Sequence, residues 1–173
     1  MAQPSSSTRA GFSRRAWLLG TALPLALAGC GFQLRQAPDF AFQSIHIAAA
    51  PTSALATELR RSIASSGGVR VTPPDQAQVV LEFVTDQREK TVVGLNASGQ
   101  VREFQLRTRL RFRLRTPGGK ELIALTELLQ QRDISFNEAA VLSKEAEENL
   151  LYRDMQTDLV RQVMRRLAAI KSV

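Results

Sequence analysis

The chain has 173 residues, of which 44% are hydrophobic, 23 are basic and 16 are acidic, giving a formal net charge of +7. This length suits one domain with a substantial core. The chain has a single cysteine, which therefore has no partner for an internal disulfide. It also has a single histidine, and one cysteine and one histidine are too few ligands for a His/Cys metal centre.

The N-terminal segment has the pattern of a secretory signal. Residues 1–15 contain Arg9, Arg14 and Arg15 but no acid, and residues 16–28 are almost wholly apolar. The apolar run is shorter than the roughly 20 residues that span a bilayer, and small residues follow it. We therefore predict a signal peptide at residues 1–29, rather than a buried core helix. Residues 13–18 also fit a twin-arginine motif, so both export routes stay open.

The letters L-A-G-C at residues 27–30 resemble the lipobox of bacterial lipoproteins, in which the cysteine becomes the acylated first residue. The resemblance implies lipid attachment at Cys30, and Gly31 favours the outer membrane. Residues 30–41 would then form a tether, with no free thiol left. Export leaves 20 basic and 16 acidic residues. It excludes nucleic acid and leaves an anionic membrane surface, an anionic lipid or an acidic protein as partners.

Two short elements are predicted at the start of the domain. Residues 42–49 alternate partly in hydrophobicity and indicate a strand, with His46 on the face opposite Ile45 and Ile47. Apolar residues then recur every four positions from residue 55 to residue 63, and two glycines follow at 67 and 68. This spacing predicts a short amphipathic helix, followed by a brief extended piece at residues 69–71.

Three long strands are predicted next, at residues 78–93, 101–115 and 122–136, separated by turn residues. The third is ambiguous, because its leucine pattern also suits a helix, but the hairpin turn before it favours a strand. In the first, Val79, Leu81, Phe83 and Thr85 are expected on one face. The opposite face is expected to carry Glu82, Asp86, Arg88 and Lys90.

A long amphipathic helix is predicted at residues 143–171, with Ser143 as its N-cap and apolar residues at every fourth position from 151 to 167. Glutamates lie near its start and basic residues near its end, which complements the helix dipole. The order of elements predicts a single α+β domain at residues 42–173. Its two helices would pack on one face of a mostly antiparallel four-stranded sheet.

Few residues point to catalysis. A Ser-His-Asp arrangement would need His46, and no motif such as G-x-S-x-G lies near it, so a structural histidine is favoured. No pair of carboxylates is singled out, and neither a metal nor a cofactor is predicted. A small periplasmic hydrolase therefore remains a minor hypothesis.

The strand at residues 101–115 carries a row of arginines at alternate positions, which lie about 6.6 Å apart on one face. Two interpretations stay open. The row is either an ordinary solvated face, with Glu82 and Asp86 as possible counter-charges, or a set of forked donors for phosphate or carboxylate groups. The residues of the row are Arg107, Arg109, Arg111, Arg113 and Arg115.

Several segments together resemble the LPS-assembly lipoprotein LptE family. They are C-G-F-Q-L-R at residues 30–35, G-Q-V-R-E-F-Q-L at residues 99–106, Ser135 and Phe136, and L-S-K-E-A-E-E at residues 142–148. Tyr152, Met155 and residues 165–167 continue the similarity, which covers residues 30–173.

The resemblance implies two helices on a mostly antiparallel four-stranded sheet, and a non-catalytic role. Such a protein plugs the outer-membrane β-barrel LptD and helps it assemble, binds lipopolysaccharide and helps to pass it to the cell surface. Lys144 matches a basic position implicated in lipopolysaccharide binding. A second basic position is replaced here by Ala97 and Ser98, for which Lys90, Arg102 or the arginine row could substitute. A different outer-membrane accessory lipoprotein, for barrel assembly or peptidoglycan association, is the alternative.

Overall fold

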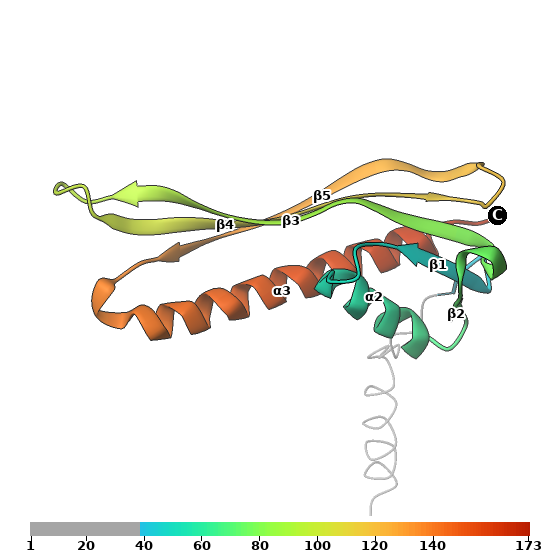
Figure 1. Ribbon diagram of the computed structural model, residues 1–173, viewed down its shortest axis with the longest axis horizontal. Helices are drawn as coiled ribbons and strands as arrows, with labels where there is room; N and C mark the ends of the chain where they lie inside the picture. Colours follow the sequence, from blue (N-terminus) through green and yellow to red (C-terminus); the bar gives the residue numbers. More distant parts are fainter. Residues whose placement is uncertain (1–38) are drawn as a thin grey trace, which may run out of the picture. The chain divides into compact units, whose positions relative to one another are not determined.

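The computed structural model describes residues 39–173, and the calls on the signal peptide, on Cys30 and on most of the tether lie outside this range. Within it, α2 and α3 lie together beneath a long sheet (Figure 1). Two short 3-10 turns, Pro74–Gln76 and Glu138–Ala140, precede β3 and α3. The other elements are β1 (Ser44–Ala48), α2 (Ala54–Ser65), β2 (Arg70–Val71), β3 (Val79–Leu95), β4 (Val101–Arg115), β5 (Glu121–Ser135) and α3 (Val141–Ala168).

The sheet has five strands in the order β2-β1-β3-β4-β5. Strand β1 pairs parallel with both β2 and β3, whereas β3, β4 and β5 are antiparallel. The predicted α+β class with two helices on a sheet is confirmed, but the four-stranded count is wrong and the sheet is mixed. The strand left out of that count, β2, lies in the extended piece predicted at residues 69–71, and α2 forms the crossover that makes its pairing with β1 parallel.

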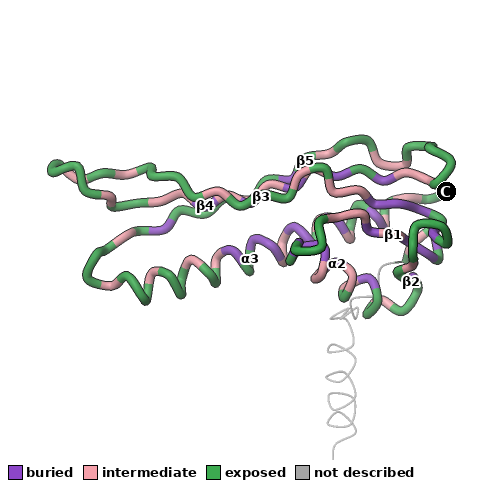
Figure 2. Tube along the Cα trace, viewed as in Figure 1, coloured by how far each residue is buried: buried purple, intermediate pink, exposed green. Residues whose placement is uncertain are grey.

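The core lies between the sheet and the helices, and no helix of residues 39–173 lies on the opposite face of the sheet (Figure 1). One cluster joins β1, α2 and the second half of α3 to β4 through fully buried side chains that include Leu59, Phe112 and Leu159. A smaller cluster of Leu106, Ile134, Tyr152 and Met155 lies beneath the part of the sheet that only α3 covers. Burial alternates along β4 for this reason (Figure 2).

A β-bulge in β3 changes the faces predicted for that strand. The register shifts between Phe83 and Thr85, so Val84 is an extra residue. Beyond it, Asp86, Arg88 and Lys90 lie opposite Leu110, Thr108 and Leu106, on the helix side of the sheet. The prediction that these three polar residues share a face with Glu82 is therefore wrong.

The start of α3 also differs from the prediction. The helix begins at Val141, so Ser143 lies inside its first turn rather than at the N-cap. The side chain of Asn137 instead caps the preceding 3-10 turn by accepting a hydrogen bond from the amide of Ala139 at 3.0 Å. In the part of the chain that the structure describes, no helix has the length and hydropathy needed to cross a membrane.

The bulge in β3 and the start of α2 are linked by one buried serine. Ser53 Oγ accepts from the amide of Ala56 at 2.9 Å and donates to Asp86 Oδ2 at 2.6 Å. We expect Ser53→Ala to lower the free energy of unfolding by about 1–2 kcal/mol, because a cap and a hydrogen bond to a charge are both lost.

Urea denaturation of the domain checks this value. Ser65→Ala, at the exposed end of the same helix, is the control and should change stability by less than about 0.5 kcal/mol. Equal stability of the two variants would contradict the proposed link.

Candidate functional site

The arginine row lies on the face of the sheet opposite α2 and α3, the face that no helix covers in the described part of the chain. Along β4, Leu106, Leu110, Phe112 and Leu114 are fully buried against the helices, and the arginines alternate with them. Because side chains alternate along a strand, the row must project from the other face. The sequence prediction of an apolar face and a basic face on β4 is confirmed.

One end of the row is neutralised within the domain. Glu82 on β3 accepts from Arg113 Nε at 2.6 Å, and its other oxygen accepts from Arg115 Nε at 2.8 Å and from Arg115 Nη2. Hydrogen bonds from Arg115 and then Arg113 hold the pKa of the Glu82 carboxyl below its ordinary value, against a smaller opposing effect of burial. Of the two acids considered as counter-charges, only Glu82 serves, because the bulge turns Asp86 to the helix side.

The rest of the row has no such partner. Arg107 Nε donates to Gln105 Oε1 at 2.7 Å, and Arg109 Nε is buried without a hydrogen-bond partner. Between residues 39 and 173, no ion pair involves Arg107, Arg109 or Arg111. We call these three half-buried residues the open arginines. Adjacent guanidinium groups repel one another, so an anion from outside the domain would be stabilised between them.

Lys144 lies elsewhere, at the far end of the domain where α3 begins. Its Nζ donates to Ser135 Oγ and to Glu147 Oε2, both at 2.9 Å. It lines a notch of about 70 Å³ together with Phe104, Phe136 and Lys90. The Nζ of Lys90 lies 4.3 Å from the centre of the Phe104 ring and 2.6 Å from Glu148 Oε2.

The structure thus separates the predicted site residues into two groups. Lys144 lies with Lys90 in the notch, whereas the open arginines lie on the other face of the sheet. The sequence named Lys90 as a substitute for the missing basic position but placed it on the wrong face. Sequence analysis gave no role to Phe104 and Phe136, whose rings meet edge to face at 5.4 Å in the notch.

A network of polar side chains fixes α3 beneath the sheet. Arg88 Nη2 donates to Gln156 Oε1 at 2.6 Å, and Gln156 Nε2 donates to Glu58 of α2. Arg88 also lies over the Tyr152 ring, at 5.2 Å from its centre. Burial, more than the nearby Glu148 charge, raises the pKa of the Tyr152 hydroxyl, which donates to the carbonyl oxygen of Glu89 at 2.9 Å.

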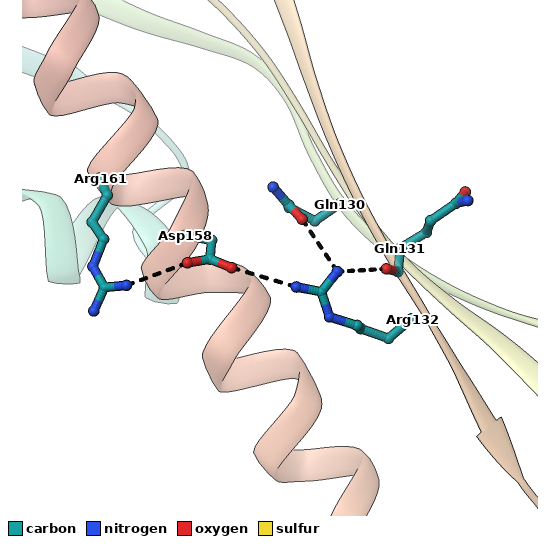
Figure 3. Close-up of polar contacts among 5 residues, drawn as sticks. All are labelled: Gln130, Gln131, Arg132, Asp158 and Arg161. Atoms are coloured by element: carbon teal, nitrogen blue, oxygen red, sulfur yellow. Dashed lines mark hydrogen bonds and ion pairs between the residues drawn. The ribbon is translucent and has the colours of Figure 1, made fainter.

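An exposed chain of charges joins α3 to β5. Arg132 Nη2 lies 3.5 Å from Asp158 Oδ2, and Arg161 Nη1 lies 3.4 Å from Asp158 Oδ1 (Figure 3). Such exposed pairs contribute about 0–1 kcal/mol each, so they add little to the stability of the domain.

His46 has a structural environment. Its Nδ1 lies 3.0 Å from the carbonyl oxygen of Thr72, just after β2. A cluster of His, Cys, Asp or Glu side chains able to hold a metal ion is not found among residues 39–173.

Comparison with known proteins gives relatives of the whole domain. The model of the LptE family, described as lipopolysaccharide-assembly, matches residues 42–167. The solution structure of uncharacterized lipoprotein B from Nitrosomonas europaea is 35% identical with a TM-score of 0.70, covering 80% of this chain and 91% of that chain. No curated protein matches the chain in sequence.

Two further solved structures share the fold at lower identity. Rare lipoprotein B from Shewanella oneidensis is 21% identical with a TM-score of 0.61, covering 73% of this chain and 95% of that chain. A minor lipoprotein from Acinetobacter baumannii is also 21% identical with a TM-score of 0.61, covering 76% and 94%. The family match extends from just before β1 into the last turn of α3 and confirms the resemblance seen in the sequence. The chain therefore belongs to the LptE family of lipopolysaccharide-assembly proteins.

Proposed function

We propose that this protein is an outer-membrane lipoprotein, anchored through Cys30, that binds lipopolysaccharide and assists its delivery to the cell surface. In the same proposal it plugs an LptD-like β-barrel and helps it to assemble. The observation that carries the proposal is the set of open arginines on an uncovered sheet face, in a chain of this family. The role is binding and chaperoning, without catalysis.

The open arginines suit the phosphate groups of lipopolysaccharide. Arginine presents a planar fork of donors that binds a phosphate through two parallel hydrogen bonds. Side chains at alternate positions are about 6.6 Å apart, so one bound phosphate can lie between two neighbours. Arg113 is the weaker member of the predicted set, because Glu82 already occupies its Nε.

The notch at the far end offers a second contact. Lys144 and Lys90 place two ammonium groups beside the Phe104 and Phe136 rings. Lys90 is paired with Glu148 and Lys144 with Glu147, so an anionic headgroup would compete with these carboxylates for the two lysines. Lys144 is the position that the family resemblance connects with lipopolysaccharide.

The uncovered sheet face also suits the interior of a barrel. Large outer-membrane barrels have polar lumens, and a plug inside one needs a polar surface. Strand β4 presents such a surface while its apolar side chains stay within the domain core. The barrel wall and lipopolysaccharide could therefore share the same basic face.

The first prediction from this proposal concerns the open arginines. Arg107→Glu with Arg111→Glu should weaken binding to purified lipopolysaccharide by at least about tenfold, since one hydrogen bond to a charged group contributes about 1.5–3 kcal/mol. Arg61→Glu with Arg153→Glu, on exposed helix positions, changes the net charge equally and is the matched control. Calorimetric titration gives both affinities. If both variants lose the same affinity for lipopolysaccharide, the arginine row acts only through the net charge of the domain and is not a binding site.

The second prediction concerns the notch. Lys144→Glu should lower lipopolysaccharide affinity by about tenfold, because it replaces an attractive charge beside the apolar rings by a repulsive one. Lys120→Glu makes the same change at the other end of the domain and should have little effect. An unchanged affinity in the Lys144 variant would remove the notch from the binding surface.

The third prediction concerns the partner. The tagged lipoprotein, extracted from outer membranes with mild detergent and captured by affinity, should retain a large β-barrel of the LptD kind, identified by mass spectrometry. If the protein binds lipopolysaccharide but retains no such barrel, the proposed role as a barrel plug is wrong and only the lipid-binding role is supported. Capture of a different outer-membrane partner, with no lipopolysaccharide binding, would favour the accessory-lipoprotein alternative.

A further inference from the structure

The chain enters the domain at one end of the sheet, which we call the entry end. Ile45 pairs with Val79, and Val80 pairs with Arg115 just before the β4–β5 turn. The first described residues and this turn therefore lie at the same end, where α3 also finishes (Figure 1). The far end, with the lysine notch, is opposite.

An open groove of about 470 Å³ crosses the entry end, between the β4–β5 turn and the end of α3. Lys120, Arg166 and Lys171 line it, all of them exposed. Partly buried apolar side chains, Leu122, Ile123 and Ile170, form its floor.

The groove is basic because its cations lack internal partners. Over residues 39–173, the side chains of Lys120, Arg166 and Lys171 make no ion pair and no hydrogen bond. Glu121 is the one acid in the lining. Helix α3 has no acid after Asp158, whereas Arg161, Arg165 and Arg166 follow it. Lysine and arginine side chains at a membrane interface place their methylene groups along apolar surface and keep their charged groups in the water. An apolar floor bordered by such residues has this arrangement.

We propose that the entry end docks on a membrane surface of anionic phospholipid. This inference rests on the proposed function, because the lipid anchor at Cys30 is what would hold the entry end near a membrane in the cell. Nine chain steps separate Cys30 from Asp39, so the entry end stays within about 32 Å of the anchor even when the chain is fully extended. That tether holds the groove at a high effective concentration above the lipid headgroups. The cations bind the phosphates while the apolar floor meets the interface.

The groove and the open arginines then divide two tasks. The entry end binds the phospholipid surface that carries the anchor, and the sheet face and the notch stay available for lipopolysaccharide.

Vesicle binding by the unacylated domain tests the proposal independently of the anchor. Residues 39–173 contain both core clusters of the domain, so we expect this fragment to fold without the N-terminal segment. We expect it to cosediment with vesicles of phosphatidylcholine and phosphatidylglycerol, but not with phosphatidylcholine alone. High salt should release it.

Charge reversal locates the surface. Lys120→Glu with Arg166→Glu and Lys171→Glu should weaken vesicle binding by about a hundredfold, since each basic residue near an anionic surface contributes about fivefold. Arg107→Glu with Arg109→Glu and Arg111→Glu makes an equal change in net charge on the sheet face and should largely keep vesicle binding. Circular dichroism and thermal melting confirm that both variants fold.

The outcomes separate this proposal from the proposed function. Equal loss in the two triple variants, or loss only in the sheet-face variant, would overturn docking through the entry end, as would an absence of vesicle binding by the unaltered domain. The entry-end variant should bind purified lipopolysaccharide with unchanged affinity. If it loses lipopolysaccharide and keeps phosphatidylglycerol vesicles, the groove is a lipopolysaccharide site and phospholipid docking is wrong.

Discussion

Burial of the apolar row of β4 against two helices is the constraint on which the rest of this structure depends. Four side chains of this row are fully buried. Leu106 belongs to the smaller core cluster, and Leu110, Phe112 and Leu114 belong to the larger one. Each buried side chain of this size contributes about 1.5–3 kcal/mol, far more than any surface ion pair of the domain. Since the alternate positions must face the other way, the core itself holds the arginine row in the open.

The bulge after Phe83 makes the two faces of the sheet functionally different. Without an extra residue, Arg88 and Lys90 would lie on the arginine face and Gln87 and Glu89 would lie beneath the helices. With it, Arg88 reaches Gln156 of α3, and Lys90 reaches the notch with Lys144. One unpaired residue thus gives the helix side a polar network and places Gln87 and Glu89 opposite Arg109 and Arg107 on the outer face.

Sequence periodicity predicted the long elements because burial acts on many residues of each at once. The alternation in β4 and the apolar stripe in α3 both correspond to buried faces in the structure. The turn between β4 and β5 correctly favoured a strand over a helix for β5. Strand β2 was predicted only as an extended piece and not as a member of the sheet, since two residues carry no period and their pairing depends on β1. The bulge was not predicted, for a similar reason. Val84 is an ordinary strand residue, and only the pairing with β4 reveals that it is extra.

The candidate site shows the same division between local pattern and long-range pairing. The arginine row was visible as a pattern, but its separation into open and paired members depends on Glu82, which meets Arg113 only through the register of β3 with β4.

The pKa of Glu82 is lowered by Arg115 and Arg113, so the carboxyl stays ionised at neutral pH. Its stabilising contribution is present above the carboxyl's unfolded pKa and is lost as the pH falls through the folded one. Protonation of this one group would therefore release two more guanidinium groups to the outer face, but only at acidic pH, below the ordinary pKa of a glutamate. Under neutral conditions Glu82 leaves Arg107, Arg109 and Arg111 outside the ion pairs of residues 39–173. The register also places Glu89 opposite Arg107 and Glu127 opposite Arg111 on the same face, so the row does not present five uncompensated cations side by side.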